Sequence, residues 1–243
     1  MSKSIRTFTR AAAWKYRQAT NRWRAFPHFI VIGAQKSGTS SLFYYLSQHP
    51  QVVRSFAKEV HYFDGGLNAR IDSFQRGPEW YRAHFPLRVM LKPQQITGEA
   101  TPLYIFNPWV PERISKLLPD VKLIAVLRNP TDRAISHYFH EQRRGREPLS
   151  IAEALRAEDE RLKPAVQRGD FKDDVLLHCS YTSRGRYHEQ LSRYFKYFAR
   201  DQLLILSSEE LFREPENTLA AVYRFLGIEQ PTSRIDFKPL NVA

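Results

Sequence analysis

The residues most suited to chemistry in this sequence form a glycine-bracketed turn near its start. Residues 28–32 are mostly apolar and β-branched, which is typical of a buried parallel strand. After the turn, the pattern predicts a helix that ends before Pro50. Inward-facing backbone N–H groups, a helix N-terminus and a lysine together make an anion site. We expect the turn to bind a phosphate group through Lys36, Ser37, Gly38, Thr39 and Ser40.

This turn differs from the Walker A loop of nucleotide-hydrolysing enzymes. Gly33 and Gly38 have the Walker A separation, but a threonine follows Gly38 where that motif has its lysine. Lys36 instead precedes the second glycine. The apolar run 121–127 predicts another buried strand, and it ends in Arg128, whereas a kinase needs an Asp there to hold Mg²⁺. The pattern favours a metal-free phosphate site, with a kinase that uses ATP and Mg²⁺ as the alternative.

A carboxylate and an imidazole lie two residues apart in the segment 58–64, Lys-Glu-Val-His-Tyr-Phe-Asp. Side chains alternate along an extended chain, so Glu59 and His61 would project on the same side. Near an anion site, such a pair is suited to proton transfer. The alternative is an exposed loop with ordinary polar residues.

Together these stretches resemble the sulfotransferases that use 3′-phosphoadenosine 5′-phosphosulfate (PAPS), and most of all their heparan-sulfate O-sulfotransferase-like branch. The likeness extends over residues 29–228, which is most of the chain. It rests on residues 36–40, 58–64 and 96–104 and on Arg128 followed eight residues later by Ser136. The fold that it implies is a P-loop-like parallel β-sheet flanked by helices, with the cofactor across the carboxyl ends of the strands.

The resemblance also implies a role for each matching residue. Glu59 is the base that takes the proton of an acceptor hydroxyl, with His61 as a supporting or substituting base. Lys36 and its loop bind the 5′-phosphosulfate and stabilise charge as the sulfuryl group leaves. Arg128 and Ser136 hold the 3′-phosphate, since Arg offers a bidentate fork and Ser a hydroxyl donor. The implied activity is metal-free sulfuryl transfer from the co-substrate PAPS to a hydroxyl of a sugar, a lipid or a small molecule.

Two departures from the family pattern accompany this likeness. Ala100 stands where the heparan-sulfate enzymes have a lysine near the transferred sulfuryl group, which weakens a polysaccharide acceptor more than it weakens sulfuryl transfer. In the family, a further loop and a last helix usually complete the nucleotide pocket, whereas this sequence stops at residue 243. We therefore expect a C-terminal part that is truncated or different. A non-catalytic protein that binds a nucleotide or a membrane surface is a second alternative.

The composition suits one α/β domain, residues 27–243, preceded by a basic amphipathic extension, residues 1–26. A third buried strand is predicted at residues 203–208, and helices are predicted at residues 78–85, 111–118, 131–142, 151–168 and 215–226, with one more opening at residues 185–187. The single cysteine, Cys179, is more typical of a buried small apolar side chain than of a nucleophile. The sequence has no run of 18 apolar residues and no signal-peptide pattern, so we expect a cytoplasmic protein.

Positive charge is concentrated in the N-terminal quarter. Residues 1–58 contain ten Lys or Arg and no Asp or Glu, and so carry +10 of the net +12. Apolar side chains recur there at spacings of three and four and predict one helical stripe: Ile5, Phe8, Ala12, Tyr16, Ala19, Trp23 and Phe26. Such a helix packs on its own domain, lies on an anionic membrane or is a transit-type presequence.

No nucleic-acid-binding motif follows the basic segment, so no nucleic acid partner is expected. A second basic cluster, Arg143, Arg144 and Arg146, ends the helix predicted at residues 131–142. We expect this cluster to be solvated rather than to receive an acidic acceptor.

Overall fold

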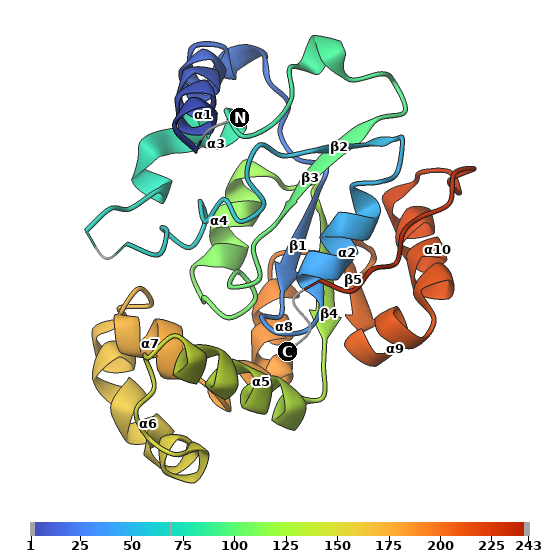
Figure 1. Cartoon of the computed structure of the whole chain (residues 1–243). Coiled ribbons are helices and arrows are strands. Elements are labelled where there is room, and N and C mark those ends of the chain that lie inside the picture. The colour runs from blue at the N-terminus through green and yellow to red at the C-terminus, as the bar shows by residue number, and fades with distance from the viewer. Residues whose placement is uncertain (1–2, 69, 241–243) are drawn as a thin grey trace.

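A parallel sheet of five strands forms the centre of the described chain. The computed structural model describes residues 3–68 and 70–240, with side chains from residue 9 onward. The strands are β1 (Phe29–Gly33), β2 (Val52–Arg54), β3 (Ile96–Ala100), β4 (Lys122–Leu127) and β5 (Leu203–Ser207), in the order β2-β3-β1-β4-β5 (Figure 1). Helices lie on both faces, so the predicted parallel sheet flanked by helices is confirmed.

The predicted helices are confirmed in the described chain, whereas the short helices Asp174–Cys179 and Ser208–Arg213 are not predicted by the sequence. The α-helices are α1 (Lys3–Ala19), α2 (Thr39–Leu46), α3 (Gly77–Arg82), α4 (Val110–Leu117), α5 (Pro130–Arg143), α6 (Ile151–Arg168), α7 (Asp174–Cys179), α8 (Tyr187–Tyr194), α9 (Ser208–Arg213) and α10 (Pro215–Leu226). The 3-10 helices are η1 (Asn21–Trp23), η2 (Phe74–Arg76), η3 (Arg88–Met90), η4 (Ser183–Gly185) and η5 (Arg200–Gln202). Both α6 and α10 have the predicted bounds, because strong local signals mark where α6 begins and α10 ends: a capping box at Ser150 and the left-handed Gly227, respectively.

The three strands that the sequence predicts, β1, β4 and β5, are confirmed within one residue at each end. The sequence does not predict β2 or β3. The former has only three residues, and the latter carries Thr97, Gly98 and Glu99 where a buried strand usually has apolar side chains. Gly98 is required there, since a Cβ atom would lie 2.5 Å from the ring of Phe29 on β1.

Alternate side chains of β1 enter the two halves of the core. Ile30 and Ile32 pack on the face that α4 and α8 cover. Phe29 and Val31 pack on the opposite face, beneath α2, α9 and α10. All four side chains are fully buried, as expected for a central strand of a parallel sheet.

The connections after β1 and β4 leave the sheet in opposite directions. The chain goes from β1 through α2 to β2, and from β4 through α5 and later helices to β5, although β1 and β4 are neighbours. Such a point in an open α/β sheet leaves a crevice at the carboxyl ends of the strands, where ligands bind. The glycine turn after β1 and Arg128 after β4 therefore face the same crevice.

A smaller helical layer, α5 to α7, lies beside the carboxyl edge of the sheet, in the lower left of Figure 1. Its own apolar cluster joins Ala134 and Tyr138 of α5 to Leu162 of α6 and Leu176 of α7. Cys179 is buried in this cluster, which agrees with the expectation of a small core side chain.

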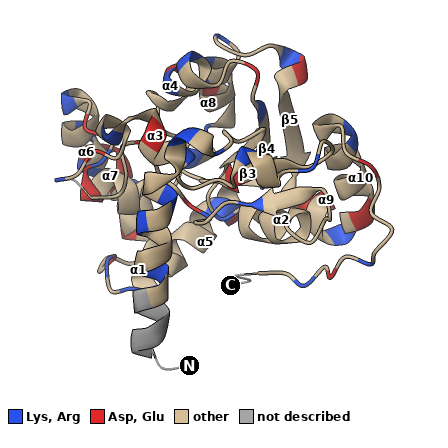
Figure 2. Cartoon of the chain, turned by 90° about the horizontal axis from the view of Figure 1, so that it is seen from above, with Lys and Arg blue, Asp and Glu red and all other residues tan. Residues whose placement is uncertain are grey.

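The N-terminal helix α1 packs on the domain through a face other than its predicted apolar stripe. Trp14 contacts the rings of Phe56, Trp80 and His84, and Arg17 donates to the carbonyls of Ala83 and Phe85. Figure 2 shows Lys and Arg, and no acidic residue, along the described part of α1.

The prediction of one continuous stripe is wrong at its C-terminal end. The helix stops at Ala19, and Phe26 instead packs against the core. Tyr16 and Trp23 are exposed to solvent, while the side chains of Ile5 and Phe8 lie outside the described residues. Within the described residues, no helix has the length and apolar character needed to span a membrane.

The segment after α10 returns along α2 to the crevice. The Tyr45 hydroxyl donates to the Phe237 carbonyl, and the backbone N–H of Leu240 donates to Ser41 Oγ at 2.9 Å. Leu240 thereby lines the crevice at the carboxyl ends of the strands. Residues 241–243 lie outside the described residues, and the expectation of a truncated or different C-terminal part stays a prediction.

Candidate active site

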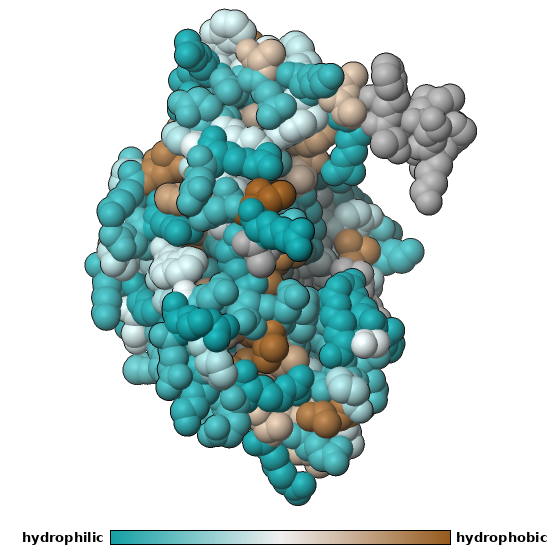
Figure 3. Space-filling model, turned by 90° about the vertical axis from the view of Figure 1, so that its left-hand side faces the viewer, coloured by the Kyte–Doolittle hydropathy of each residue, from teal (hydrophilic) through white to brown (hydrophobic). Residues whose placement is uncertain are grey.

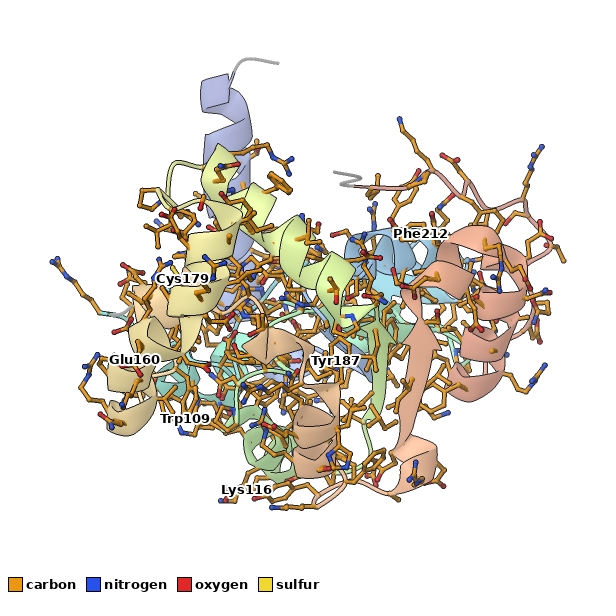
Figure 4. All side chains as sticks on the ribbon, turned by 90° about the horizontal axis from the view of Figure 1, so that it is seen from below. Trp109, Lys116, Glu160, Cys179, Tyr187 and Phe212 are labelled. Carbon is orange, nitrogen blue, oxygen red and sulfur yellow. The ribbon has the colours of Figure 1, made fainter. Side chains whose placement is uncertain are left out.

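The glycine turn after β1 is shaped by close packing and by left-handed backbone conformations. A Cβ atom on Gly33 would overlap the side chain of Ile105. Gly38 has φ = 89°, and its position leaves room for the ring of Phe212, which lies beside α2 in Figure 4. Lys36 also has a positive φ of 69°. The N-cap residue of α2, Gly38, provides no side-chain cap, so the first backbone N–H groups of that helix can donate to a bound anion.

The end of β4 and the start of α5 form the second wall of the site. Arg128 Nη1 donates to the Lys36 carbonyl at 3.3 Å, and the Tyr187 hydroxyl (Figure 4) donates to the Arg128 carbonyl at 3.0 Å. Ser136 lies two turns into α5 and faces the same cavity. Asn129 caps α5 by accepting from two backbone N–H groups. These contacts fix Arg128 against the loop that carries Lys36.

The two walls enclose a cavity of about 1280 Å³, which is large enough for a nucleotide and an acceptor. The predicted residues that line it are Lys36, Gly38, Thr39, Ser40, Glu59, His61, Arg128 and Ser136. Ser37 is the exception. Its side chain is fully buried below the loop, and its backbone N–H donates to the Ala34 carbonyl.

Positive charge gathers in this cavity. The pKa of Lys36 is lowered by burial and by the neighbouring Arg143, Arg128 and Arg144. Within residues 9–68 and 70–240, none of these four cations forms an ion pair with a carboxylate. Five carboxylates also line the cavity, namely Glu59, Asp132, Glu141, Asp174 and Glu209, and the charge of Glu141 opposes the lowering of the Lys36 pKa. Because none of them forms an ion pair with these four cations in the described part of the chain, the cations are available to a ligand with several negative charges.

The basic cluster at the end of α5 is exposed to solvent and also borders the cavity. Arg143, Arg144 and Arg146 are exposed, as expected, but all three also line the cavity. Arg146 pairs with the buried carboxylate of Glu141 at 3.2 Å, which His178 also approaches at 3.2 Å. No sequence pattern indicates this arrangement, because the cluster reaches the cavity only through the packing of α5 against α7.

Lys58 connects the phosphate loop to the candidate base, a role that the sequence pattern does not reveal. Its ammonium group donates to Ser40 Oγ at 2.7 Å and to Glu59 Oε1 at 2.7 Å. Ser40 lies in the first turn of α2, whereas Glu59 lies in the loop before His61. One side chain thus spans the gap between the anion site and the carboxylate.

Glu59 and His61 lie together, although not on a strand as the alternation suggested. The segment is a loop in which His61 has φ = 51°. His61 Nε2 lies 3.5 Å from Glu59 Oε2, and His61 Nδ1 lies 2.7 Å from the buried Asp64 Oδ2. Burial lowers the pKa of His61, but the hydrogen bond to Asp64 and the nearby negative charge of Glu59 outweigh it and raise this pKa to about 10. At neutral pH the ring is therefore a cation held between two carboxylates, a state that favours a positioning role over a base role.

Glu59 itself is ionised in this arrangement. Burial raises its pKa, but the nearby cationic ring of His61 and the ammonium group of Lys58, which donates to it, lower the pKa to about 2. Its side chain remains partly exposed to the cavity. A carboxylate without a proton, open to a pocket, can accept one from a bound hydroxyl.

A buried carboxylate on β3, Glu99, holds the loop that carries these residues. It accepts hydrogen bonds from the hydroxyls of Tyr81 and Thr101, both at 2.7 Å, and from the backbone N–H of Val60 at 3.4 Å. The hydroxyl of Tyr104, 3.3 Å from Glu99, accepts from the backbone N–H of Tyr62 in the same loop at 2.9 Å. Glu99 is fully buried and positions the loop without reaching the cavity.

Burial raises the pKa of Glu99 from 4.5 to about 7, although its hydrogen-bond donors oppose this shift. Between these two values the folded state binds more protons than the unfolded chain, so the free energy of unfolding falls as pH rises through this window. Relative to Glu99→Gln, wild type should lose about 3 kcal/mol of unfolding free energy between pH 4.5 and pH 8. Urea unfolding of both proteins at several pH values measures this difference. A difference that stays constant with pH would contradict the assignment.

Ala100, the departure from the lysine of the family, follows Glu99 on β3. It is fully buried, packs in the apolar cluster beneath α2, and does not line the cavity. Its backbone N–H donates to the carbonyl of Lys58 at 3.3 Å. Ala100, which replaces the lysine of the family, therefore contacts Lys58, and Lys58 does bring an ammonium group to the cavity.

A family model described as a sulfotransferase domain matches residues 26–237. The chain belongs to the sulfotransferase family. This membership supports sulfuryl transfer from PAPS over the kinase alternative, and it confirms the resemblance to the heparan-sulfate branch.

Two curated sulfotransferases are similar to this one over most of its length. It is 34% identical to human heparan sulfate glucosamine 3-O-sulfotransferase 5 over 83% of this chain and 54% of that protein. It is 29% identical to the membrane-associated sulfotransferase kil1 of Dictyostelium discoideum over 89% of this chain and 59% of that protein. This sulfotransferase thus spans somewhat more than half the length of these relatives.

Solved structures support the fold. The sulfotransferase of Alicyclobacillus acidocaldarius matches with a TM-score of 0.73 and 33% identity, over 88% of this chain and 85% of that one. The mouse sulfotransferase SULT7A1, solved in complex with PAP, matches with a TM-score of 0.52 and 16% identity, over 88% of this chain and 63% of that one. The second similarity concerns the fold alone.

Proposed function

We propose that this sulfotransferase moves the sulfuryl group of PAPS to an acceptor hydroxyl, with Glu59 as the general base. The observation that carries the proposal is the Lys58 ammonium group, which contacts both Ser40 at the phosphate loop and Glu59. An anion bound at the first turn of α2 would lie within reach of the carboxylate. Donor and base then face each other across the space where an acceptor oxygen must attack.

The donor side uses the cations of the cavity. Lys36 and the first N–H groups of α2 bind the 5′-phosphosulfate, and Arg128 with Ser136 binds the 3′-phosphate. The acceptor oxygen forms a bond to sulfur while the bond from sulfur to the bridging phosphate oxygen breaks. Lys36 stabilises the charge that the departing phosphate gains, and the hydroxyl proton passes to Glu59. The products are the sulfated acceptor and 3′-phosphoadenosine 5′-phosphate (PAP).

The cations around Glu59 regulate its basicity. In the free pocket, His61 and Lys58 hold its pKa at about 2, which makes it a weak base. The sulfate of PAPS competes for the ammonium group of Lys58. As Lys58 turns toward the sulfate, Glu59 loses one stabilising charge, so its pKa rises and the carboxylate becomes a better proton acceptor. His61 stays paired with Asp64 and orients the carboxylate rather than replacing it.

Lys58→Met should lower the turnover number by roughly tenfold or more, because it removes the cation next to the transferred group and the link to Glu59. Methionine keeps much of the length of the side chain without the charge. Lys163→Met, at an exposed position on α6, is the matched control and should keep wild-type turnover. Steady-state kinetics of PAPS consumption compares them, and wild-type turnover in Lys58→Met would remove Lys58 from the mechanism.

The acceptor in this proposal is a sugar, a lipid or a small molecule that bears a hydroxyl group. The names of the relatives state heparan sulfate for those proteins, and the exposed Arg143 and Arg144 at the cavity would favour an acceptor that carries negative charge. Peripheral contact with a membrane is supported by the relative described as membrane-associated. The expectation of a cytoplasmic location stays a prediction.

Calorimetric titration with PAP, and separately with ATP and Mg²⁺, tests the cofactor directly. We expect PAP to bind and ATP to bind far more weakly, because ATP has no 3′-phosphate for Arg128 and Ser136. Binding of ATP alone would revive the kinase alternative. Binding of neither would favour a non-catalytic protein with an incomplete pocket.

A further inference from the structure

The apolar stripe of α1 points away from the domain. Successive residues of an α-helix are separated by about 100°, so Ala12, Tyr16 and Ala19 lie on one side, and Trp14 and Arg17 lie nearly opposite them. The side with Trp14 and Arg17 makes the contacts with the domain. Ala12, Tyr16 and Ala19 are all exposed. The amphipathic character of this helix is therefore not explained by packing against its own domain.

The most exposed apolar side chains of the described chain gather beside this stripe. The four large hydrophobic residues with the highest exposure are Val89 at 88%, Met90 at 71%, Trp23 at 64% and Tyr16 at 57%. They come from α1 and η1, which are consecutive in the sequence, and from η3, which lies far from both in the sequence. We call the set Ala12, Tyr16, Ala19, Trp23, Val89 and Met90 the N-terminal surface.

Backbone and side-chain contacts hold the two parts of this surface together. Arg88 Nη2 donates to the carbonyl of Arg22 at 2.9 Å, and Arg24 forms a β-bridge with Leu87. The backbone N–H of Ala25 donates to the carbonyl of Pro86, just before η3, at 2.9 Å. In Figure 1 the end of α1 and the loop that contains residues 86–95 both lie at the top of the view. Arg22 and Arg88, which form this hydrogen bond, immediately precede Trp23 and Val89 in the sequence.

The charges around the N-terminal surface are almost all positive. Residues 1–58 and 80–98 contain no Asp or Glu, and residues 80–98 add Arg82, Arg88 and Lys92. The neighbouring helix α3 contributes one carboxylate, Glu79. Exposed aromatic and aliphatic side chains ringed by Lys and Arg match the interface of an anionic bilayer, where aromatic rings sit at the headgroups and cations meet the lipid phosphates.

We propose that the N-terminal surface binds the anionic face of a lipid bilayer. The proposal deepens the suggested peripheral membrane contact and does not depend on sulfuryl transfer. Because η1 precedes β1 and η3 precedes β3, the surface lies at the edge where these parallel strands begin. The phosphate loop follows β1 at the other edge, about 16 Å away along a strand of five residues. A bilayer bound at the N-terminal surface thus leaves the catalytic cavity free for its substrates.

Sedimentation with vesicles tests this proposal on the full 243-residue chain. Vesicles of phosphatidylcholine with phosphatidylserine should bind the protein, and raised salt or vesicles of phosphatidylcholine alone should weaken this binding. Trp23→Ser/Val89→Ser should lower the partition coefficient on the anionic vesicles at least about tenfold, because two apolar side chains no longer enter the interface. Arg22→Gln/Arg88→Gln should lower it as well, and should reduce its salt dependence.

The matched control is Tyr197→Ser/Val166→Ser, which removes an exposed aromatic and an exposed valine elsewhere on the chain. This control should bind vesicles like wild type. PAP affinity and melting temperature should be unchanged in Trp23→Ser/Val89→Ser, so that lost vesicle binding is separated from lost folding or function. Failure of wild type to bind anionic vesicles, or equal binding of the two serine variants, would overturn the proposal. Sedimentation velocity that showed a dimer of wild type, abolished by Trp23→Ser/Val89→Ser, would instead make this surface an interface between copies of the chain.

Discussion

Glu59→Gln is expected to lower the turnover number of sulfuryl transfer by about 10²–10⁴, the usual contribution of a general base. Glutamine has nearly the same shape and can still accept the hydrogen bond from Lys58, which approaches Glu59 at 2.7 Å, with His61 Nε2 beside it at 3.5 Å. It cannot accept the proton of the acceptor hydroxyl. Because no donor-binding group is removed, PAP should bind to the variant with nearly wild-type affinity, so the loss appears in turnover and not in donor binding.

Glu160→Gln on α6 is the control for this variant, because Glu160 is exposed and points away from the fold (Figure 4). Figure 3 shows the largely hydrophilic surface of the face on the left-hand side of Figure 1, with only scattered apolar side chains. The turnover of Glu160→Gln should equal that of wild type. Stopped-flow measurement of a single turnover separates the chemical step from product release. Unchanged turnover in Glu59→Gln would remove this residue as the base, and a parallel loss of PAP affinity would mean that Glu59 acts through the phosphate loop, by way of Lys58.

The sequence was most informative where local chemistry alone determines the structure. The glycine turn is one example: Gly38 must adopt a left-handed conformation and Gly33 has no room for a side chain, so the motif is visible in the residues themselves. The apolar runs of β4 and β5 are others. Short or polar strands carry no such signal. The role of Glu99 on β3 depends on a hydrogen bond from the backbone N–H of Val60, which lies far earlier in the sequence, so the residues around Glu99 do not reveal it.

Other parts of the site depend on contacts between distant segments. Lys58 opens a recognisable motif, yet nothing in the sequence indicates that its ammonium group reaches Ser40. The protonation of His61 depends on the fold of the loop that returns Asp64 to its ring. Likewise, the spacing of the N-terminal stripe predicts an apolar side but not its direction. Here Trp14 and Arg17 make the contacts with the domain, and the stripe remains exposed.

Arg128→Ala should weaken the discrimination between PAP and AMP, which differ by the 3′-phosphate alone. Charge-assisted hydrogen bonds to one phosphate are worth roughly 1.5–3 kcal/mol each, so PAP affinity should fall by about 10- to 100-fold. The affinity for AMP, which never engages this arginine in the proposed pose, should change little. Calorimetric titration of wild type and variant with both nucleotides measures the coupling between the side chain and the 3′-phosphate.

The comparison with AMP distinguishes two roles for Arg128. Its guanidinium also donates to the carbonyl of Lys36 at 3.3 Å, so its removal could loosen the loop that binds the 5′-phosphate. In that case PAP and AMP would lose affinity by the same factor, and the 3′-phosphate assignment would fail. Arg156→Ala, at an exposed position on α6, controls for the general loss of positive charge and should leave both affinities unchanged. A fall confined to PAP therefore assigns specificity to a direct contact, because only the nucleotide with a 3′-phosphate can register its loss.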